Sequence, residues 1–85
     1  MQKVESCSVM IVDDDPVHLE KVGRDLRDAP NIAVVGSYAN STKAADQIGK
    51  VKPDVLLTDI EMPGMSGLQL IAATKELSPE TRTKI

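Results

Sequence analysis

The sequence predicts an α/β fold in which helices connect the strands of a parallel sheet. Three short apolar segments, rich in β-branched residues, alternate with three amphipathic segments along the 85 residues. In these apolar segments, polar residues do not alternate with apolar ones as they do in a half-exposed strand. A continuous apolar run is typical of a strand buried on both faces. Repeated strand–helix units with such strands favour a parallel sheet with helical crossovers.

The first strand–helix unit lies at the acidic start of the chain. Residues 8–12 (SVMIV) are expected to form a strand that ends at three aspartates. Asp15 followed by Pro16 is typical of a helix N-cap and the first helical position. An apolar stripe at spacings of three and four follows, made of Leu19, Val22 and Leu26. This periodicity predicts an amphipathic helix over about 16–28.

The second unit repeats this order. Residues 32–36 form the next expected strand, and a helix over about 41–51 follows and ends before Pro53. Its apolar stripe consists of Ala44, Ala45, Ile48 and Val51.

The third unit begins with an expected strand over about 54–59, which again closes on an acid. A loop follows, and then a helix over about 67–77 in which Ser66 and Gln69 have the spacing of a capping box. The expected apolar side of this helix carries Leu70, Ile71, Thr74 and Leu77. Residues 82–85 resemble the entry to a fourth strand.

The composition is that of one small globular domain. Apolar residues make up 41% of the chain, which excludes disorder as the first interpretation. No apolar run exceeds four residues, as in residues 9–12, whereas a membrane span needs roughly 20. The single cysteine, Cys7, cannot form an internal disulfide. We therefore expect a cytoplasmic protein without membrane contact.

Two acidic clusters follow the first and third expected strands: Asp13, Asp14 and Asp15, and then Asp59 and Glu61. The plain interpretation is that these acids only cap a helix and end a strand. The carboxyl ends of parallel strands share one edge of the sheet, however, so both clusters meet if the two strands are neighbours. Clustered carboxylates suit Mg²⁺, and an aspartate beside such an ion can attack a phosphoryl donor.

Two segments resemble the receiver domains of two-component response regulators. Residues 9–16 (VMIVDDDP) resemble the family's first strand and acidic pair, and residues 57–67 (LTDIEMPGMSG) its phosphoacceptor strand and loop. The chain also resembles the subfamily whose receivers precede a LuxR-type helix-turn-helix domain. This resemblance lies in residues 31–36, 52–54 and 78–82. The resemblance runs from about residue 8 to 85, which is about two thirds of a family domain.

This resemblance implies a flavodoxin-like, doubly wound parallel sheet, truncated to three strand–helix units and the start of strand 4. Residues 1–85 would form a partial receiver domain that is not itself an enzyme. It would take a phosphoryl group from a sensor histidine kinase with Mg²⁺ as cofactor and regulate an output, transcription. DNA would be contacted only through an output domain absent from this chain.

The resemblance also implies roles for individual residues. Asp59 would be the phosphoacceptor, Asp14 a direct Mg²⁺ ligand and Asp13 a ligand or water-bridged partner. Glu61 would be a ligand through its backbone carbonyl. The chain ends before the family's Ser or Thr after strand 4 and Lys after strand 5, so switching is not implied for this chain.

Other residues near these motifs have plainer interpretations. His18, in the first turn of the first helix, is expected to be a solvated residue because it has no partner motif. Met62 and Met65 are expected to pack in the loop. Gly64 and Gly67 suggest a positive φ or a close backbone approach.

Two other functions remain open at this point. Residues 9–17 also fit the Asp-x-Asp-x-Val motif of haloacid-dehalogenase-like phosphatases, with Asp13 as nucleophile and Asp15 as general acid. The chain could instead be a receiver-like interaction module that is not phosphorylated.

Right-handed crossovers place the first helix alone on one face of the sheet. We therefore expect a homodimer or swapped oligomer of the fragment.

Overall fold

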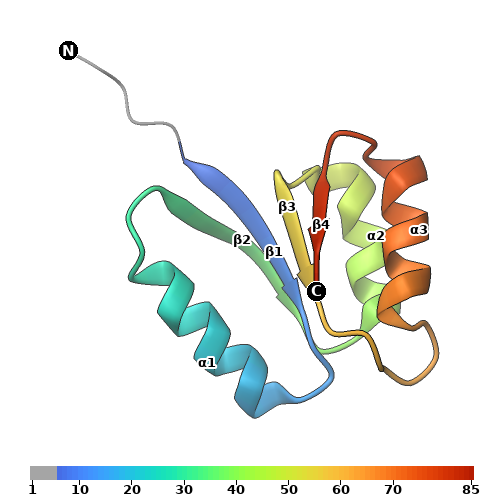
Figure 1. Cartoon of the computed structure of the whole chain (residues 1–85), viewed down its shortest axis with the longest axis horizontal. Helices are drawn as coiled ribbons and strands as arrows, with labels where there is room; N and C mark the ends of the chain where they lie inside the picture. Colours follow the sequence, from blue (N-terminus) through green and yellow to red (C-terminus); the bar gives the residue numbers. More distant parts are fainter. Residues whose placement is uncertain (1–5) are drawn as a thin grey trace.

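The computed structural model describes residues 6–85 and contains a four-stranded parallel sheet in the order β2-β1-β3-β4 (Figure 1). The elements are β1 (Cys7–Val12), α1 (Pro16–Arg27), β2 (Ile32–Tyr38), α2 (Ser41–Val51), β3 (Val55–Thr58), α3 (Gly67–Leu77) and β4 (Arg82–Lys84). The expected α/β fold class is confirmed, and the stub at the end of the chain forms a fourth strand paired with β3.

The two strands that precede the acidic clusters are neighbours. β1 pairs with β3 in parallel, and the pairing ends with Val12 opposite Thr58. The next backbone N–H group, that of Asp59, donates a hydrogen bond to the carbonyl of Val12 over 3.0 Å. Asp13 and Asp59 therefore leave the sheet side by side.

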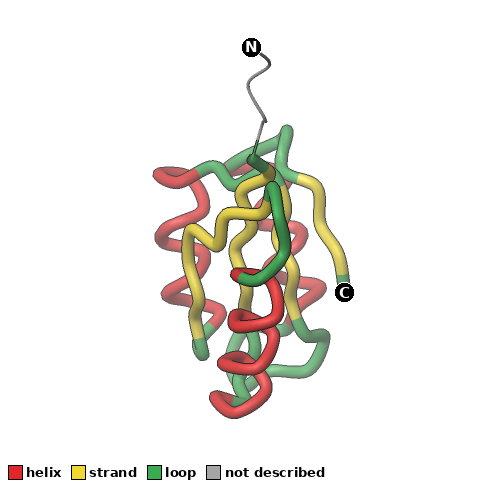
Figure 2. Tube along the Cα trace, turned by 90° about the vertical axis from the view of Figure 1, so that its left-hand side faces the viewer, coloured by secondary structure: helices red, strands yellow, loops and turns green. Residues whose placement is uncertain are grey.

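Helices cover the two faces of the sheet unequally. α1 lies on one face, whereas α2 and α3 lie together on the other, as right-handed crossovers require (Figures 1 and 2). The buried core cluster consists of Met10, Val12, Ala44, Ile48, Leu56 and Leu70. It fills the layer between the sheet and the α2–α3 pair. On the opposite face, α1 is the one helix that residues 6–85 supply (Figure 1).

The helix starts follow the local sequence. The Asp15 side chain caps α1 by accepting a hydrogen bond from the N–H of Val17, and Ser66 and Gln69 form the expected capping box at α3. α2 is capped by Asn40. These caps satisfy backbone N–H groups that have no partner within a helix.

Several segments differ from the expected ranges. β2 runs on past Gly36 to Tyr38, and its register against β1 shifts between Val9 and Met10. A Cβ atom on Gly36 would lie 2.7 Å from the Tyr38 ring, so the glycine makes room for that ring. The last apolar residues of α2 and α3, Val51 and Leu77, are exposed rather than in the core.

Membrane crossing has no support in the part of the chain that the structure describes. None of the helices within residues 6–85 combines the length and the apolar character that a bilayer span demands.

Candidate phosphoacceptor and metal site

Three carboxylates converge where β1 and β3 end. Asp13, Asp14 and Asp59 each place one oxygen atom within 4.8 Å of the others. Asp13 is buried, whereas Asp14 and Asp59 are exposed. Like charges at this separation repel one another, which favours a bound cation. The structure thus brings together three of the four predicted site residues.

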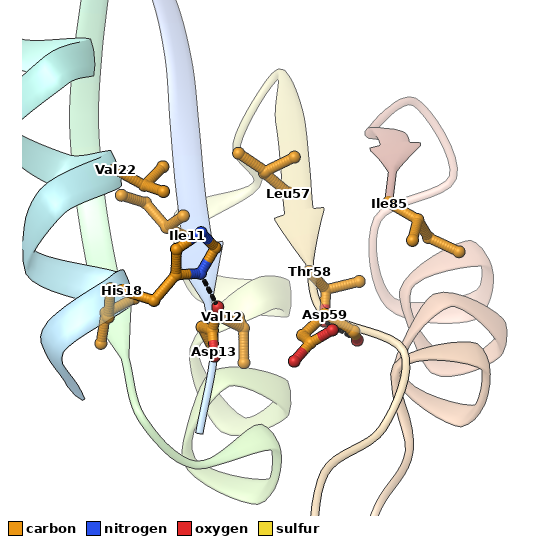
Figure 3. Close-up of a pocket in the computed structure, with 10 residues that line it drawn as sticks. Ile11, Val12, Asp13, His18, Val22, Leu57, Thr58, Asp59 and Ile85 are labelled. Carbon is orange, nitrogen blue, oxygen red and sulfur yellow. Dashed lines mark hydrogen bonds and ion pairs between the residues drawn. The ribbon is translucent and has the colours of Figure 1, made fainter. Parts of the chain in front are cut away.

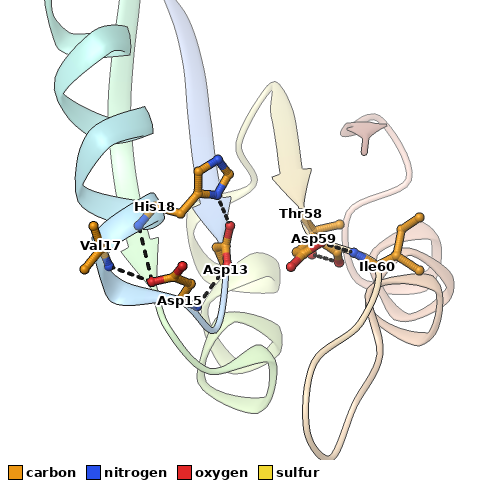
Figure 4. A network of polar contacts seen from close by, with 7 residues as sticks. All are labelled: Asp13, Asp15, Val17, His18, Thr58, Asp59 and Ile60. Carbon is orange, nitrogen blue, oxygen red and sulfur yellow. Dashed lines mark hydrogen bonds and ion pairs between the residues drawn. The ribbon is translucent and has the colours of Figure 1, made fainter.

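Asp13 is held at both of its carboxylate oxygens (Figure 4). Oδ1 accepts a hydrogen bond from the backbone N–H of Asp15 over 2.9 Å, and Oδ2 is hydrogen-bonded to Nδ1 of His18. The Asp13 side chain is only 10% exposed, against 59% for His18. The buried carboxylate therefore has a fixed orientation.

His18 is a solvated residue of the first turn of α1, as expected, and it also has a partner that the sequence does not indicate. Its ring is exposed to solvent, as predicted, but its Nδ1 atom contacts Asp13. The hydrogen bond to Asp13, followed by the negative charge of Asp13, raises the pKa of His18. No local signal indicates this contact, because the tight turn that leads from β1 into α1 creates it.

The backbone of Asp59 is fixed while its carboxylate stays exposed. Its N–H group donates to the carbonyl of Val12, and its carbonyl accepts a hydrogen bond from Oγ1 of Thr58 over 2.9 Å. Oδ1 accepts a hydrogen bond from the N–H of Ile60 over 2.9 Å. A reactant can thus reach a carboxylate that is anchored to the sheet.

The loop after Asp59 closes through a close backbone approach at Gly67. A Cβ atom on Gly67 would lie 1.9 Å from the carbonyl oxygen of Asp59, and its N–H donates to the carbonyl of Ile60 over 2.7 Å. Gly64 has a φ of +80°. The two glycines therefore serve the two purposes that the sequence suggested, one each.

The same loop is tied to the core from its other side. Oγ of Ser41, a buried residue at the start of α2, donates to the carbonyl of Met65 over 2.6 Å. Met62 and Met65 pack against the core cluster, as expected. No local sequence signal points to Ser41, since the contact joins residues 24 positions apart.

Two acidic residues of the sequence clusters lie outside the group of three carboxylates. Glu61 is exposed in the loop after β3, and only its backbone carbonyl was predicted to act. Asp15 caps α1, and its Oδ1 accepts from the N–H of Val17 over 3.0 Å. Capping leaves Asp15 poorly suited to act as the general acid of a phosphatase.

A cavity of about 160 Å³ adjoins the site on the face of the sheet that α1 covers (Figure 3). Apolar side chains line most of it, including Ile11, Val22, Leu57 and Ile85. Asp13, His18 and Asp59 line its polar end. The acidic site therefore borders an apolar surface.

The chemistry of the three carboxylates fits a hard divalent cation. Mg²⁺ prefers oxygen ligands and is typically bound through one or two carboxylates, with further positions left to water and phosphate oxygens. Asp13, Asp14 and Asp59 offer such oxygens within reach of a single ion.

The comparisons with known sequences point to signalling proteins. A family model described as "Response regulator receiver domain" matches residues 9–85. The transcriptional regulatory protein BtsR of Salmonella typhi is 40% identical over 77 residues, which cover 91% of this chain and 31% of that protein. A protein-glutamate methylesterase/protein-glutamine glutaminase of Treponema pallidum is 36% identical over 77 residues, with 91% and 19% covered. The chain spans less than a third of the length of these two relatives.

Solved structures show the same similarity in three dimensions. The receiver domain of the response regulator NarL from Mycobacterium tuberculosis superposes with a TM-score of 0.86 at 37% identity, covering 93% of this chain and 64% of that one. The isolated receiver domain of RcsB from Salmonella enterica serovar Typhimurium gives 0.83 at 30% identity, covering 93% and 59%.

Proposed function

The chain belongs to the response regulator receiver domain family, and from this premise we propose that Asp59 accepts a phosphoryl group from a sensor histidine kinase in the cytoplasm. The observation that carries the proposal is the convergence of Asp13, Asp14 and Asp59 within 4.8 Å, at the carboxyl ends of β1 and β3. Asp59 is the exposed member that follows β3, and its backbone is anchored to Val12.

In the proposed reaction, an oxygen of the Asp59 carboxylate attacks the phosphorus of a phosphohistidine. The new P–O bond forms as the P–N bond breaks, and the imidazole leaves with the electron pair and takes up a proton. Two hydrogen bonds hold the buried Asp13 carboxylate, so its orientation is set before charge develops on the phosphoryl group.

We further propose that Mg²⁺ is held by Asp13, Asp14 and Asp59, with the backbone carbonyl of Glu61 as a fourth protein ligand. When bound, the ion would offset the repulsion among the carboxylates and stabilise charge on the phosphoryl oxygens. The donor set supports this assignment, since all three side chains offer carboxylate oxygens.

The output of the whole protein is a further proposal, because the chain spans less than a third of the first curated relatives. We infer that it is transcription through a LuxR-type output domain. BtsR is a transcriptional regulatory protein, and RcsB is described in a complex with DNA. The methylesterase relatives show that a similar receiver also occurs in an enzyme.

A second copy of the chain is the other partner that we propose. Within the described part of the chain, α1 is the one helix on its face of the sheet (Figure 1). Ile85, at the rim of the apolar cavity, is 57% exposed. The outer edge of β4 pairs with no strand among residues 6–85. Open strand edges beside apolar surface favour association.

Phosphorylation by a small acyl phosphate with Mg²⁺ tests the proposed nucleophile. Intact-mass analysis should show one phosphoryl adduct that forms slowly on residues 1–85, and Asp59→Asn should abolish it. Asp15→Asn is the matched control, because asparagine caps a helix as well as aspartate and the variant removes one nearby charge. An adduct that survives Asp59→Asn would contradict the proposal.

Asp13→Asn, compared with Asp59→Asn, distinguishes the phosphatase alternative. Sustained Mg²⁺-dependent hydrolysis of a chromogenic phosphate ester, abolished by Asp13→Asn but not by Asp59→Asn, would favour a haloacid-dehalogenase-like enzyme. A receiver-like module that is not phosphorylated would give neither an adduct nor hydrolysis.

A further inference from the structure

His18 lies beside the three-carboxylate site without being one of its three members. Its Nδ1 atom is hydrogen-bonded to Oδ2 of Asp13, and the ring lines the polar end of the apolar cavity (Figures 3 and 4). The group of oxygens within 4.8 Å of one another contains Asp13, Asp14 and Asp59. His18 therefore contacts a candidate ligand rather than the centre of the site.

The hydrogen bond between His18 and Asp13 limits how the Asp13 carboxylate can rotate. The last side-chain torsion of aspartate has a broad energy minimum, so a carboxylate with a single partner can rotate. Asp13 has two partners, the Asp15 N–H on Oδ1 and the His18 ring on Oδ2. Together they fix the plane of the carboxylate, and each oxygen keeps a lone pair for another contact.

The side chain that supplies the second contact is itself fixed. His18 belongs to the first turn of α1, and its backbone N–H and that of Val17 both donate to Oδ1 of Asp15. The N-cap thus fixes the turn that carries the imidazole.

We propose that His18 is a positioning residue, which holds the Asp13 carboxylate in the orientation that serves the divalent cation. The proposal rests on the proposed function, because it assigns His18 a role in the same Mg²⁺ site. Partners that hydrogen-bond to metal ligands typically change metal affinity by 10- to 100-fold when removed. The ring is 59% exposed and water can replace part of its contact, so the lower end of this range applies.

The experiment is a Mg²⁺ titration of the whole chain, followed by backbone amide shifts. In His18→Ala, Mg²⁺ should bind about 10-fold more weakly than in the parent. His18→Asn should restore binding, because its amide nitrogen is attached to Cγ, as Nδ1 is in histidine. His18→Gln places its nitrogen one atom further out and should bind as weakly as the alanine variant.

A double-mutant cycle tests whether His18 acts through Asp13. In an Asp13→Asn background, His18→Ala should cause no further loss of Mg²⁺ affinity. A full additional loss would overturn the proposal, as would an asparagine variant that binds as weakly as the alanine variant. Urea unfolding of each variant should be cooperative, which checks that a loss of affinity does not come from a loss of the fold.

The outcomes separate this inference from the proposed function. A parent chain that binds Mg²⁺ at residues 13–15 and 59–61, with His18→Ala binding equally well or more tightly, would overturn only the role of His18. A parent chain that binds no Mg²⁺ would overturn both the cation site and the role of His18 in it.

Discussion

Replacing Gly67 by alanine should displace the proposed phosphoacceptor. The added Cβ would lie 1.9 Å from the carbonyl oxygen of Asp59, 2.8 Å from its carbonyl carbon and 2.9 Å from Cα of Ile60. All three are backbone atoms, which cannot rotate away as a flexible side chain can. Real Cβ atoms essentially never lie within 3.0 Å of another atom. The two segments must therefore separate by at least 1.1 Å, the difference between 3.0 and 1.9 Å.

Two effects set the change in stability. Overpacking of this kind costs about 1–3 kcal/mol of unfolding free energy. Restricting the unfolded chain by changing glycine to alanine returns about 0.4–1 kcal/mol. We expect a net loss of about 1–2 kcal/mol. Because the strain falls on Asp59 itself, a shift of about 1 Å should also slow phosphorylation by on the order of 100-fold.

Urea denaturation and the rate of adduct formation at Asp59 measure the two effects. Gly49→Ala is the matched control, because its Cβ would meet the Leu77 side chain at an ordinary 3.8 Å. This variant should be as stable as the parent or slightly more stable, and equally reactive. If Gly67→Ala were as stable and as reactive as the parent, the close approach at Asp59 would not constrain the site.

Three more predictions follow from the site and the sheet. Mg²⁺ should shift amide signals of residues 13–15 and 59–61 most, and Asp14→Ala should weaken binding; the largest shifts elsewhere would show that the site is misplaced. Hydrogen bonds from the backbone N–H and side chain of Ser8 lower the pKa of Asp54 below its usual 3.8. The parent should therefore be more stable than Asp54→Asn above pH 3.8, and the difference should vanish as the pH falls through the folded-state pKa. The unfolding midpoint should rise with protein concentration, because a second copy binds the folded chain. A midpoint independent of concentration, together with a monomeric mass in light scattering, would exclude the dimer.

The sequence alone determined the local structure and the order of the elements. Residues 9–12 are apolar throughout and are buried in β1, because a strand inside a parallel sheet has no solvent face. Asp15, Ser66 and Gln69 cap their helices as predicted, since capping depends only on residues within one turn. The acidic residues at the strand ends were also visible, but their spacing only permitted a shared site.

The tertiary structure decided which of these residues meet. The neighbouring of β1 and β3 brings Asp13 and Asp59 together across more than 40 positions of the chain. The contact of His18 with Asp13 depends on how one turn is folded. The approach of Gly67 to Asp59 depends on how one loop closes. Local propensity describes each segment separately, whereas these contacts depend on the position of one segment relative to another, which only packing determines.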